Sequence, residues 1–294
     1  MVELATPQAA AKFRSEVKPT WCPGCGDFGV LNSLQTACAT LNINPKDLAV
    51  VSGIGCSSNL SGFMKSYGMH TLHGRGVAVA QGIRLGNHGL TVVSAGGDGD
   101  GYGIGVGHFI HAMRRNINVT YIVMNNQIYG LTTGQASPTT AKDHKTKSTP
   151  GGNLENALNP LGLALMAGAS FVARGFSGDS QGLSDIMTKA IAHRGFSLVD
   201  ILSPCVTYNK LNTYAWFRER VYKLDEKGHD ATNIEAALNA CLDWEQRIGL
   251  GVLYQVPRPT YEEQDPSLSE FGPLVNHKLG LADEDWKAVI QEFV

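Results

Sequence analysis

Two short polar motifs, each placed directly after an apolar run, constrain the fold of this chain more than any other feature. Gly97-Asp98-Gly99 follows the run Leu90–Ala95, and Asn125-Asn126 follows the run Val119–Met124. The segment 106–113 between them has apolar residues at helical spacing. Strand, crossover helix and parallel strand therefore place Asp98 and Asn126 at the same edge of a sheet.

The residue types at this edge are suited to a metal-bound diphosphate. A carboxylate and an amide oxygen are hard ligands of the kind that Mg²⁺ takes from a protein. The flanking glycines let backbone N–H groups approach a phosphate closely. An EF-hand loop starting at Asp98 would need Glu where Phe109 stands, and the glycines from Gly97 to Gly107 contain no G-x-G-x-x-G dinucleotide motif. A plain turn before a helix explains the first motif alone, but not its pairing with the two asparagines.

The six cysteines fall into two groups. Cys38 and Cys241 lie on apolar stripes of two predicted helices, the second stripe running from Ile234 to Ile248, and we expect both in the core. The second group has two cysteines in one C-x-x-C turn and two that follow predicted strands: Cys22, Cys25, Cys56 and Cys205. Four such thiolates can bind zinc or an iron–sulfur cluster, whereas the C-x-x-C turn alone fits a redox pair equally well. A disulfide framework is disfavoured in a chain of this length without a secretory signal.

The order of the apolar runs predicts an α/β fold with a doubly wound, mainly parallel sheet. Runs rich in Val and Ile, without polar alternation, are typical of strands buried on both faces. Asp27 is expected to begin a helix that reaches Leu41. We expect one α/β domain over residues 17–225 and a C-terminal extension over 226–294, which is a helix followed by an irregular arm. The predicted strands lie near 48–53, 90–95, 119–124, 170–174 and 197–202.

Charge and hydropathy argue against two classes of partner. The chain has 24 Lys and Arg against 26 Asp and Glu, so no basic excess predicts nucleic-acid binding. Its most apolar long stretch, Leu158–Val172, is broken by polar residues and too short to span a membrane. Reduced cysteines and the lack of a signal peptide predict a cytoplasmic protein.

The paired motifs resemble the thiamine diphosphate (TPP) motif shared by transketolases, 2-oxoacid decarboxylases and 2-oxoacid oxidoreductases. Further strings are similar, in the same order, to those of the β subunit of 2-oxoacid:ferredoxin oxidoreductases, over about Val17–Arg220. The fold implied is the diphosphate module of the TPP-binding fold. The strings are Trp21-Cys22-Pro23-Gly24-Cys25-Gly26, Ile54-Gly55-Cys56-Ser57-Ser58, His73-Gly74-Arg75, Gly97-Asp98-Gly99-Asp100, Asn125-Asn126-Gln127-Ile128-Tyr129-Gly130, Pro204-Cys205 and Tyr208-Asn209.

The resemblance implies three sets of site residues. Mg²⁺ is expected on Asp98, the Asn126 side chain and the Ile128 carbonyl. A 4Fe–4S cluster is expected on Cys22, Cys25, Cys56 and Cys205. His73 and Arg75 are the expected catalytic residues, able to hydrogen-bond a substrate or a cofactor phosphate. The residues expected to bind TPP are Ile54, Gly55, Cys56, Ser57, His73, Gly74, Arg75, Gly97, Gly99, Asp100, Gly130 and Leu131.

The implied activity is the oxidative decarboxylation of a 2-oxoacid with coenzyme A, which gives an acyl-CoA and CO₂. Electrons would pass through the 4Fe–4S cluster to ferredoxin, and the reaction is reversible in the family. An α subunit is expected to complete the site, in a heterodimer or a dimer of heterodimers. Two alternatives stay open: a non-oxidative TPP-dependent lyase with a structural zinc site, and a catalytically silent subunit that binds a partner.

Three further features bear on substrate and partners. Asn59 occupies a position where several relatives carry a basic residue that helps to recognise the substrate, and Lys65 could take over this role. We favour 2-oxoglutarate over pyruvate as the substrate. Residues 141–153 are typical of a mobile surface loop, or alternatively of a lid or a docking site for ferredoxin or coenzyme A. His108 and His111 could share a metal, but a polar helix face is the better interpretation. The arm after residue 257 is expected to wrap a neighbouring subunit.

Overall fold

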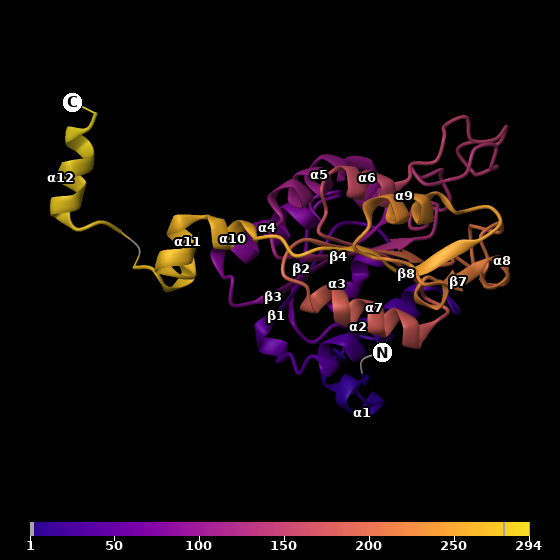
Figure 1. The fold of residues 1–294 in the computed structure, drawn as a ribbon, viewed down its shortest axis with the longest axis horizontal. Coiled ribbons are helices and arrows are strands. Elements are labelled where there is room, and N and C mark those ends of the chain that lie inside the picture. The colour runs from indigo at the N-terminus through magenta and orange to yellow at the C-terminus, as the bar shows by residue number, and fades with distance from the viewer. Residues whose placement is uncertain (1–2, 279, 294) are drawn as a thin grey trace.

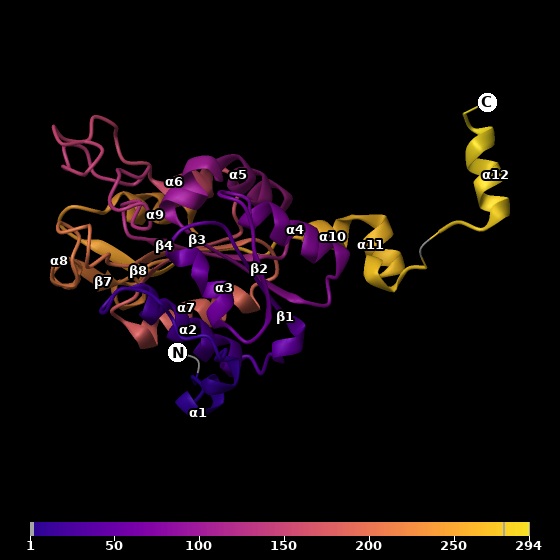
Figure 2. The same cartoon turned by 180° about the vertical axis from the view of Figure 1, so that it is seen from behind.

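The structure, a computed structural model, describes residues 3–278 and 280–293. Its strands form one sheet in the order β2-β1-β3-β4-β6-β5-β8-β7, with helices on both faces (Figures 1 and 2). Neighbouring strands are parallel except β5 and β8, which are antiparallel. The strands are β1 (Leu48–Ser52), β2 (Tyr67–His70), β3 (Thr91–Gly97), β4 (Thr120–Asn125), β5 (Phe171–Phe176), β6 (Ser197–Leu202), β7 (Val221–Lys223) and β8 (Ile248–Gln255).

The α-helices cover the sheet because the side chains of its central strands point alternately to two apolar layers. Leu48 and Val50 of β1 pack with α2 and α7, whereas Ala49 and Val51 pack with α4 and α5 on the other face. This confirms the predicted doubly wound α/β fold. The helices are α1 (Pro7–Ala10), α2 (Asp27–Thr40), α3 (Leu60–Phe63), α4 (Gly76–Gly86), α5 (Val106–Arg115), α6 (Pro160–Met166), α7 (Ser180–Ala192), α8 (Tyr214–Arg218), α9 (Ile234–Leu242), α10 (Tyr261–Gln264), α11 (Pro266–Phe271) and α12 (Asp283–Gln291).

The five predicted strands correspond to β1, β3, β4, β5 and β6, and each is buried along most of its length. Two of the helices predicted from spacing form as expected: α2 begins at Asp27, and α5 ends before Asn116, whose φ of 51° is left-handed. Strand β2 was not predicted, because all four of its residues are exposed at the sheet edge and carry no apolar periodicity.

The segment predicted as a helix and an irregular arm contains a strand, β8, that the sequence analysis missed. Helix α9 ends at Leu242, and Ile248 begins β8 instead of extending the helical stripe, so that part of the prediction was wrong. Because β8 pairs with β5, the main sheet continues beyond residue 225. Glycines at 249 and 251 interrupt the apolar alternation of β8 and hide it as a strand.

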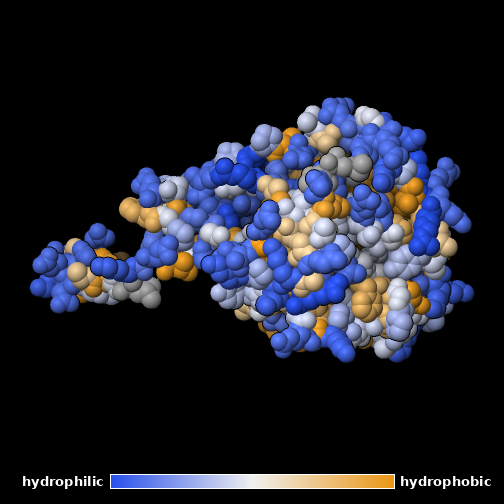
Figure 3. All heavy atoms as spheres, turned by 90° about the horizontal axis from the view of Figure 1, so that it is seen from below, coloured by the Kyte–Doolittle hydropathy of each residue, from blue (hydrophilic) through white to orange (hydrophobic). Residues whose placement is uncertain are grey.

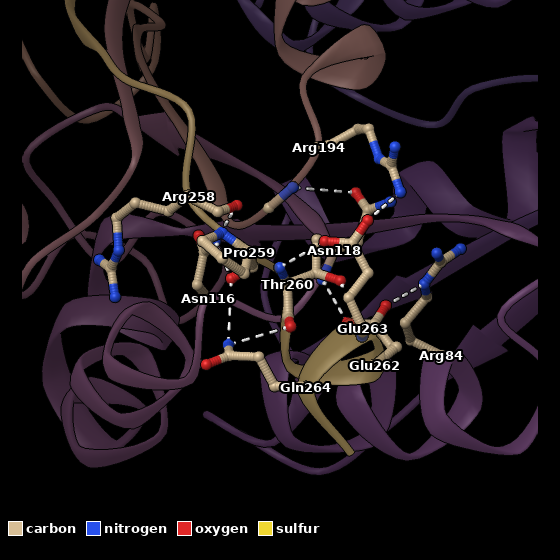
Figure 4. A network of polar contacts seen from close by, with 11 residues as sticks. Arg84, Asn116, Asn118, Arg194, Arg258, Pro259, Thr260, Glu262, Glu263 and Gln264 are labelled. Atoms are coloured by element: carbon tan, nitrogen blue, oxygen red, sulfur yellow. Dashed lines mark hydrogen bonds and ion pairs between the residues drawn. The ribbon is translucent and has the colours of Figure 1, made fainter. Parts of the chain in front are cut away.

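Beyond β8 the chain leaves the body as an arm whose base is anchored by polar contacts (Figure 4). Glu262 of α10 pairs with Arg84 of α4 at 2.5 Å, and Glu263 pairs with Arg194. Asn116 donates hydrogen bonds to the carbonyls of Arg258 and Pro259. Helix α12 stands clear of the body in both ribbon views, and Figure 3 shows hydrophobic surface along the arm, where Phe271, Trp286, Ile290 and Phe293 are among the exposed side chains.

Two further features concern membrane-spanning helices and the predicted loop at residues 141–153. No helix in the described part of the chain is long and apolar enough to cross a membrane. Residues 141–153 contain no helix or strand, as expected of a loop. The loop is nevertheless tied at its base, because buried Asn153 donates to the carbonyls of Thr140, Ala141 and Glu155.

Candidate active site

The carboxyl ends of the parallel strands meet at one cavity. Loops after β1, β3 and β4 contribute most of its wall, as expected for a ligand site in an open α/β sheet. Of the residues predicted to bind TPP, all but Gly74 and Arg75 line this cavity. The lining residues are Ile54, Gly55, Cys56, Ser57, His73, Gly97, Asp98, Gly99, Asp100, Asn126, Ile128, Tyr129, Gly130, Leu131 and Thr132.

Asp98 is a buried carboxylate at the end of β3, where the chain enters a π-helical segment, Gly99–Ile104. Its Oδ2 atom accepts hydrogen bonds from Ser137 Oγ and Thr139 Oγ1, both at 2.6 Å. Burial raises the pKa of Asp98 to about 6, although the two hydroxyl donors act in the opposite direction. A divalent cation at this carboxylate would offset the cost of burying its charge.

Asn126 and Asn125 have different partners, which separates their roles. Asn126 lines the cavity, and its Oδ1 accepts the backbone N–H of Ile128 at 3.0 Å. The intervening Gln127 has a φ of 59°, so the chain turns sharply and Ile128 also reaches the cavity. Asn125 instead donates its side-chain amide N–H to the carboxylate of buried Asp200. Asp98, Asn126 and Ile128 thus line the same cavity. Their carboxylate, amide oxygen and backbone carbonyl are of the types that fit Mg²⁺.

Asp100 joins two walls of the cavity. Its Oδ1 accepts the backbone N–H of Ile54 at 2.9 Å and that of Gly74 at 2.7 Å. Burial raises the pKa of Asp100, while these two donors lower it. Gly53 is required beside it, since a Cβ there would lie 2.0 Å from the carboxylate. Asp100 therefore fixes the loops that follow β1 and precede α4.

The predicted catalytic residues have different positions. His73 lines the cavity, and its side chain is about one-third exposed. Its buried Nδ1 has no hydrogen-bond partner among the residues that the structure describes and lies 3.8 Å from Asp100 Oδ1. Arg75 does not line the cavity, and its guanidinium contacts His108 Nε2 at 2.8 Å. His111 contacts Arg114 instead. The two histidines of α5 therefore have separate arginine partners, consistent with a polar helix face.

The four cysteines outside the core come from three connected segments. Cys56 and Cys205 approach each other, because a Cβ added at Gly130 would lie 3.8 Å from both sulfur atoms. The Cys22–Cys25 turn is joined to the Cys205 segment by the Gly26 N–H, which donates to Pro204 O at 3.1 Å. Trp21 Nε1 donates to the carbonyl of Cys56 at 2.6 Å. These contacts bring the three segments together beside the cavity that Cys56 lines.

Electrostatics also link these thiols. Burial, followed by the Asp27 carboxylate, raises the pKa of Cys56 to about 11, and Cys205 and Cys22 add to the shift. The same two leading causes raise the pKa of Cys25 well above its usual range. Such thiols are protonated unless a metal displaces the proton. Cys38 and Cys241 are buried in the two apolar layers, as predicted.

The four cysteines outside the core could bind either a zinc ion or an iron–sulfur cluster. Among the residues that the structure describes, no group of three or more His, Cys, Asp or Glu side chains is placed to hold one metal ion. A structural zinc ion would need such a convergent group. In a 4Fe–4S cluster each thiolate binds a different iron atom, so the four sulfur atoms need not converge on one point. Four thiolates are a donor set known for both kinds of centre.

Several residues at the site were not predicted from the sequence. Tyr129 lines the cavity and donates its hydroxyl hydrogen to Gly99 O at 3.0 Å. Ser137 and Thr139 reach Asp98 from the loop after β4. A serine and a threonine in a polar loop carry no distinctive signal, and only proximity in the fold reveals them.

Two family models match the chain. Residues 53–201 match the C-terminal TPP-binding domain of thiamine pyrophosphate enzymes. Residues 205–270 match the C-terminal part of the pyruvate ferredoxin oxidoreductase beta subunit. The fold and the cavity therefore define a thiamine pyrophosphate enzyme module.

Individual relatives narrow this class. The chain is 45% identical to subunit beta of 2-oxoacid:ferredoxin oxidoreductase 1 from Aeropyrum pernix, over 90% of this chain and 88% of that one. It is also 45% identical to the 2-oxoglutarate oxidoreductase subunit KorB of Mycobacterium tuberculosis, over 69% of this chain and 54% of that protein. The solved 2-oxoglutarate:ferredoxin oxidoreductase of Magnetococcus marinus superposes with a TM-score of 0.88 at 41% identity, covering 95% of both chains. The chain belongs to the β subunits of the 2-oxoacid:ferredoxin oxidoreductases.

Proposed function

We propose that this β subunit binds TPP through Mg²⁺ at Asp98, Asn126 and Ile128 and holds a 4Fe–4S cluster on Cys22, Cys25, Cys56 and Cys205. In the complete enzyme it would oxidise a 2-oxoacid with coenzyme A to an acyl-CoA and CO₂ and reduce ferredoxin. One observation carries the proposal: Cys56 lines the same cavity as Asp98 and Asn126. Diphosphate site and thiolate site therefore share a wall, which favours electron transfer over release of an aldehyde.

TPP, when bound, supplies a carbon nucleophile for the keto group and accepts the electron pair left by decarboxylation. The residues of the chain position and shield the reactants. Asp100 holds together the loop after β1 and the loop before α4. Tyr129 lines the cavity and is fixed by its hydrogen bond to Gly99 O. His73 lines the cavity and its side chain is about one-third exposed, so the imidazole can hydrogen-bond the substrate or a phosphate.

Arg75 is proposed to act by its charge at the rim. Its guanidinium contacts His108 of α5, and Arg75 does not line the cavity, although it is two residues from His73, which does. The nearby positive charge also lowers the pKa of His108, after the larger effect of burial, so the histidine stays neutral and can accept the hydrogen bond. A cation at this position would attract a dicarboxylate substrate from solution.

The exposed apolar residues around the cavity mouth support a partner subunit. Leu72, Ile104 and Leu131 are each more than half exposed, and Leu131 lines the cavity itself. Edge strand β2, which leads directly to Leu72, exposes Tyr67 and Met69. An α subunit seated here would bury these side chains and complete the site. We further propose that the arm after residue 257 contacts a neighbouring subunit.

We favour 2-oxoglutarate as the substrate. The names of the M. tuberculosis and M. marinus relatives support it, the latter having been solved with 2-oxoglutarate, coenzyme A and succinyl-CoA bound. Neither Asn59 nor Lys65 lines the cavity. Neither residue therefore explains the preference from this chain alone, and residues of the partner subunit are proposed to contribute.

The decisive experiment is anaerobic co-purification with the α subunit, followed by assay of ferredoxin reduction. Turnover is expected to require coenzyme A and to be faster with 2-oxoglutarate than with pyruvate. The complex should contain about four iron atoms and absorb visible light near roughly 400 nm, with the absorption bleached on reduction. A colourless, zinc-containing complex that releases an aldehyde without coenzyme A would identify a non-oxidative lyase instead. Full turnover by the Asp98→Ala complex would mean that this chain is a silent subunit.

A further inference from the structure

The carboxylate of Asp98 is held asymmetrically. Both hydroxyl donors, Ser137 Oγ and Thr139 Oγ1, bind the same oxygen, Oδ2, at 2.6 Å. All three side chains are almost fully buried. Hydrogen bonds to an ionised oxygen are short and strong, so Oδ2 is fully engaged. The other oxygen, Oδ1, accepts no hydrogen bond from a described side chain and is the one left for a cation.

Further hydrogen bonds hold Ser137 and Thr139 in place. The Ser137 backbone N–H donates to Thr140 Oγ1 at 2.7 Å, and that hydroxyl donates to Gln127 O at 2.7 Å. Thr139 Oγ1 also lies 3.0 Å from Asn125 Oδ1, and Asn125 donates its amide to Asp200. These contacts tie the loop 137–140 to the end of β4. The pair of hydroxyls therefore cannot follow Asp98 if its carboxylate rotates.

We propose that Ser137 and Thr139 hold Asp98 as a one-oxygen ligand and thereby make the site select Mg²⁺ over Ca²⁺. This inference rests on the proposed function, in which Asp98 binds the cation of TPP. Neither Ser137 nor Thr139 lines the cavity. Both act through Asp98 and are positioning residues.

The selection follows from what each cation requires. Mg²⁺ needs six close ligands in octahedral geometry and is satisfied by a carboxylate that gives one oxygen. Ca²⁺ accepts six to eight ligands at longer distances and commonly takes both oxygens of a carboxylate. With Oδ2 engaged by two donors, Asp98 can offer only Oδ1, which leaves Ca²⁺ short of a ligand. Removal of the donors frees the carboxylate to turn and to bind through both oxygens.

The test measures the binding of TPP to the cofactor-depleted αβ complex by calorimetry, with Mg²⁺ or Ca²⁺ as the cation. The half-saturating concentration of each cation gives the selectivity ratio. In the Ser137→Ala/Thr139→Val double variant, Mg²⁺ is expected to bind roughly tenfold to a hundredfold more weakly. Ca²⁺ is expected to lose far less, so that the ratio falls by about tenfold or more. The single variants should each show part of this change if the double variant does not fold.

Two matched variants separate selectivity from stability. Thr139→Ser keeps the hydroxyl and should keep the wild-type ratio. Thr120→Val removes another buried hydroxyl at the opposite end of β4, where it donates to Ala190 O, and should lower stability without changing the ratio. An unchanged ratio in the double variant, or equal weakening of both cations, would overturn the inference.

Failure of the proposed function has a different signature. Asp98→Ala should abolish the cation dependence of TPP binding. If that dependence persists in Asp98→Ala, the cation site itself is elsewhere and both proposals are wrong. If Asp98→Ala abolishes it while the double variant keeps the wild-type ratio, only the role of Ser137 and Thr139 is wrong.

Discussion

Ile54 and Gly74 donate their backbone N–H groups to the same oxygen of Asp100, at 2.9 and 2.7 Å. The two donors belong to loops that are 20 residues apart in the chain and form different walls of the cavity. A single side chain therefore sets the distance between the walls.

Replacing Asp100 by Ala should leave both N–H groups buried without an acceptor. We expect a loss of about 3 kcal/mol in the free energy of unfolding and weaker binding of TPP. Asp100→Asn keeps an acceptor oxygen and should recover part of both. Denaturant unfolding and calorimetry measure the two effects; an Ala variant with wild-type stability would contradict the role given to Asp100.

The pKa of Asp98 predicts a pH dependence of opposite sign for stability and for cation binding. Burial raises this pKa to about 6 in the folded chain, whereas a carboxyl in the unfolded chain titrates near about 4. Between these values the folded state binds more protons, so this contribution to stability falls as pH rises from about 4 to 6. Cation affinity rises over the same range, because the cation needs the ionised carboxylate.

Asp98→Asn should remove both dependences. The comparison is the difference between wild type and variant at each pH, because Asp27 is also buried and its pKa is likewise raised to about 6. Thermal unfolding of the cofactor-free protein and Mg²⁺ titration in the presence of TPP provide the two profiles. Parallel profiles for wild type and variant would show that Asp98 does not titrate in this range.

Gly99 and Gly107 provide a matched pair in one segment. A Cβ at Gly99 would lie 2.2 Å from a ring carbon of Tyr129, whereas a Cβ at Gly107 meets nothing within 4 Å. Gly99→Ala should push Tyr129 into the cavity, weaken TPP binding and cost about 1–3 kcal/mol. Gly107→Ala, in the helix α5, should stabilise the protein by roughly 0.5–1 kcal/mol. Equal TPP affinities of the two variants would refute the predicted displacement.

The cysteines allow a similar comparison. Cys56→Ala should lose most of the iron and the visible absorption, since it removes one of four thiolates. Cys38→Ala should keep the iron and lower the free energy of unfolding by only about 1 kcal/mol, because Cys38 is fully buried among apolar side chains of the core. Metal analysis of anaerobically purified complexes decides between these outcomes. A Cys56→Ala complex with full iron content would exclude Cys56 as a ligand.

The base of the arm contains two ion pairs that differ in burial. Arg84 and Glu262 are 14% and 5% exposed, while Arg194 and Glu263 are 76% and 39% exposed. Glu262→Gln should lower the free energy of unfolding by about 3 kcal/mol, because it leaves a buried guanidinium without its charged partner. Glu263→Gln should cost less than about 1 kcal/mol, since solvent screens the exposed pair. Similar losses in the two variants, measured by thermal unfolding, would contradict this assignment.

Much of the candidate site followed from the sequence because its residues sit at strand ends. Asp98 and Asn126 each close a buried apolar run, and parallel pairing brings such ends to one edge. Residues held by tertiary contacts alone gave no such signal. Ser137 and Thr139 lie in a loop without periodicity, and Arg75 turned out to face His108 on α5 and not the cavity.

The same distinction explains the strands. Strand β4 is buried along its whole length and was predicted within a residue, whereas β2 is exposed along its whole length and was missed. Strand β8 is half-buried, contains glycines and pairs antiparallel to β5, so its sequence resembles neither a buried parallel strand nor a helix.

Parallel pairing of β1, β3, β4 and β6 also defines where the molecule can be modified. The turns at Asn44–Asp47 and Asn87–Gly89 precede the amino ends of β1 and β3, which are opposite the carboxyl ends where the cavity lies. Strand β1 has five residues and β3 has seven, so at about 3.3 Å per residue the two turns lie roughly 17 and 23 Å from the cavity end of the sheet. Affinity tags, fluorophores or surface tethers inserted there would report on the working enzyme without touching its chemistry.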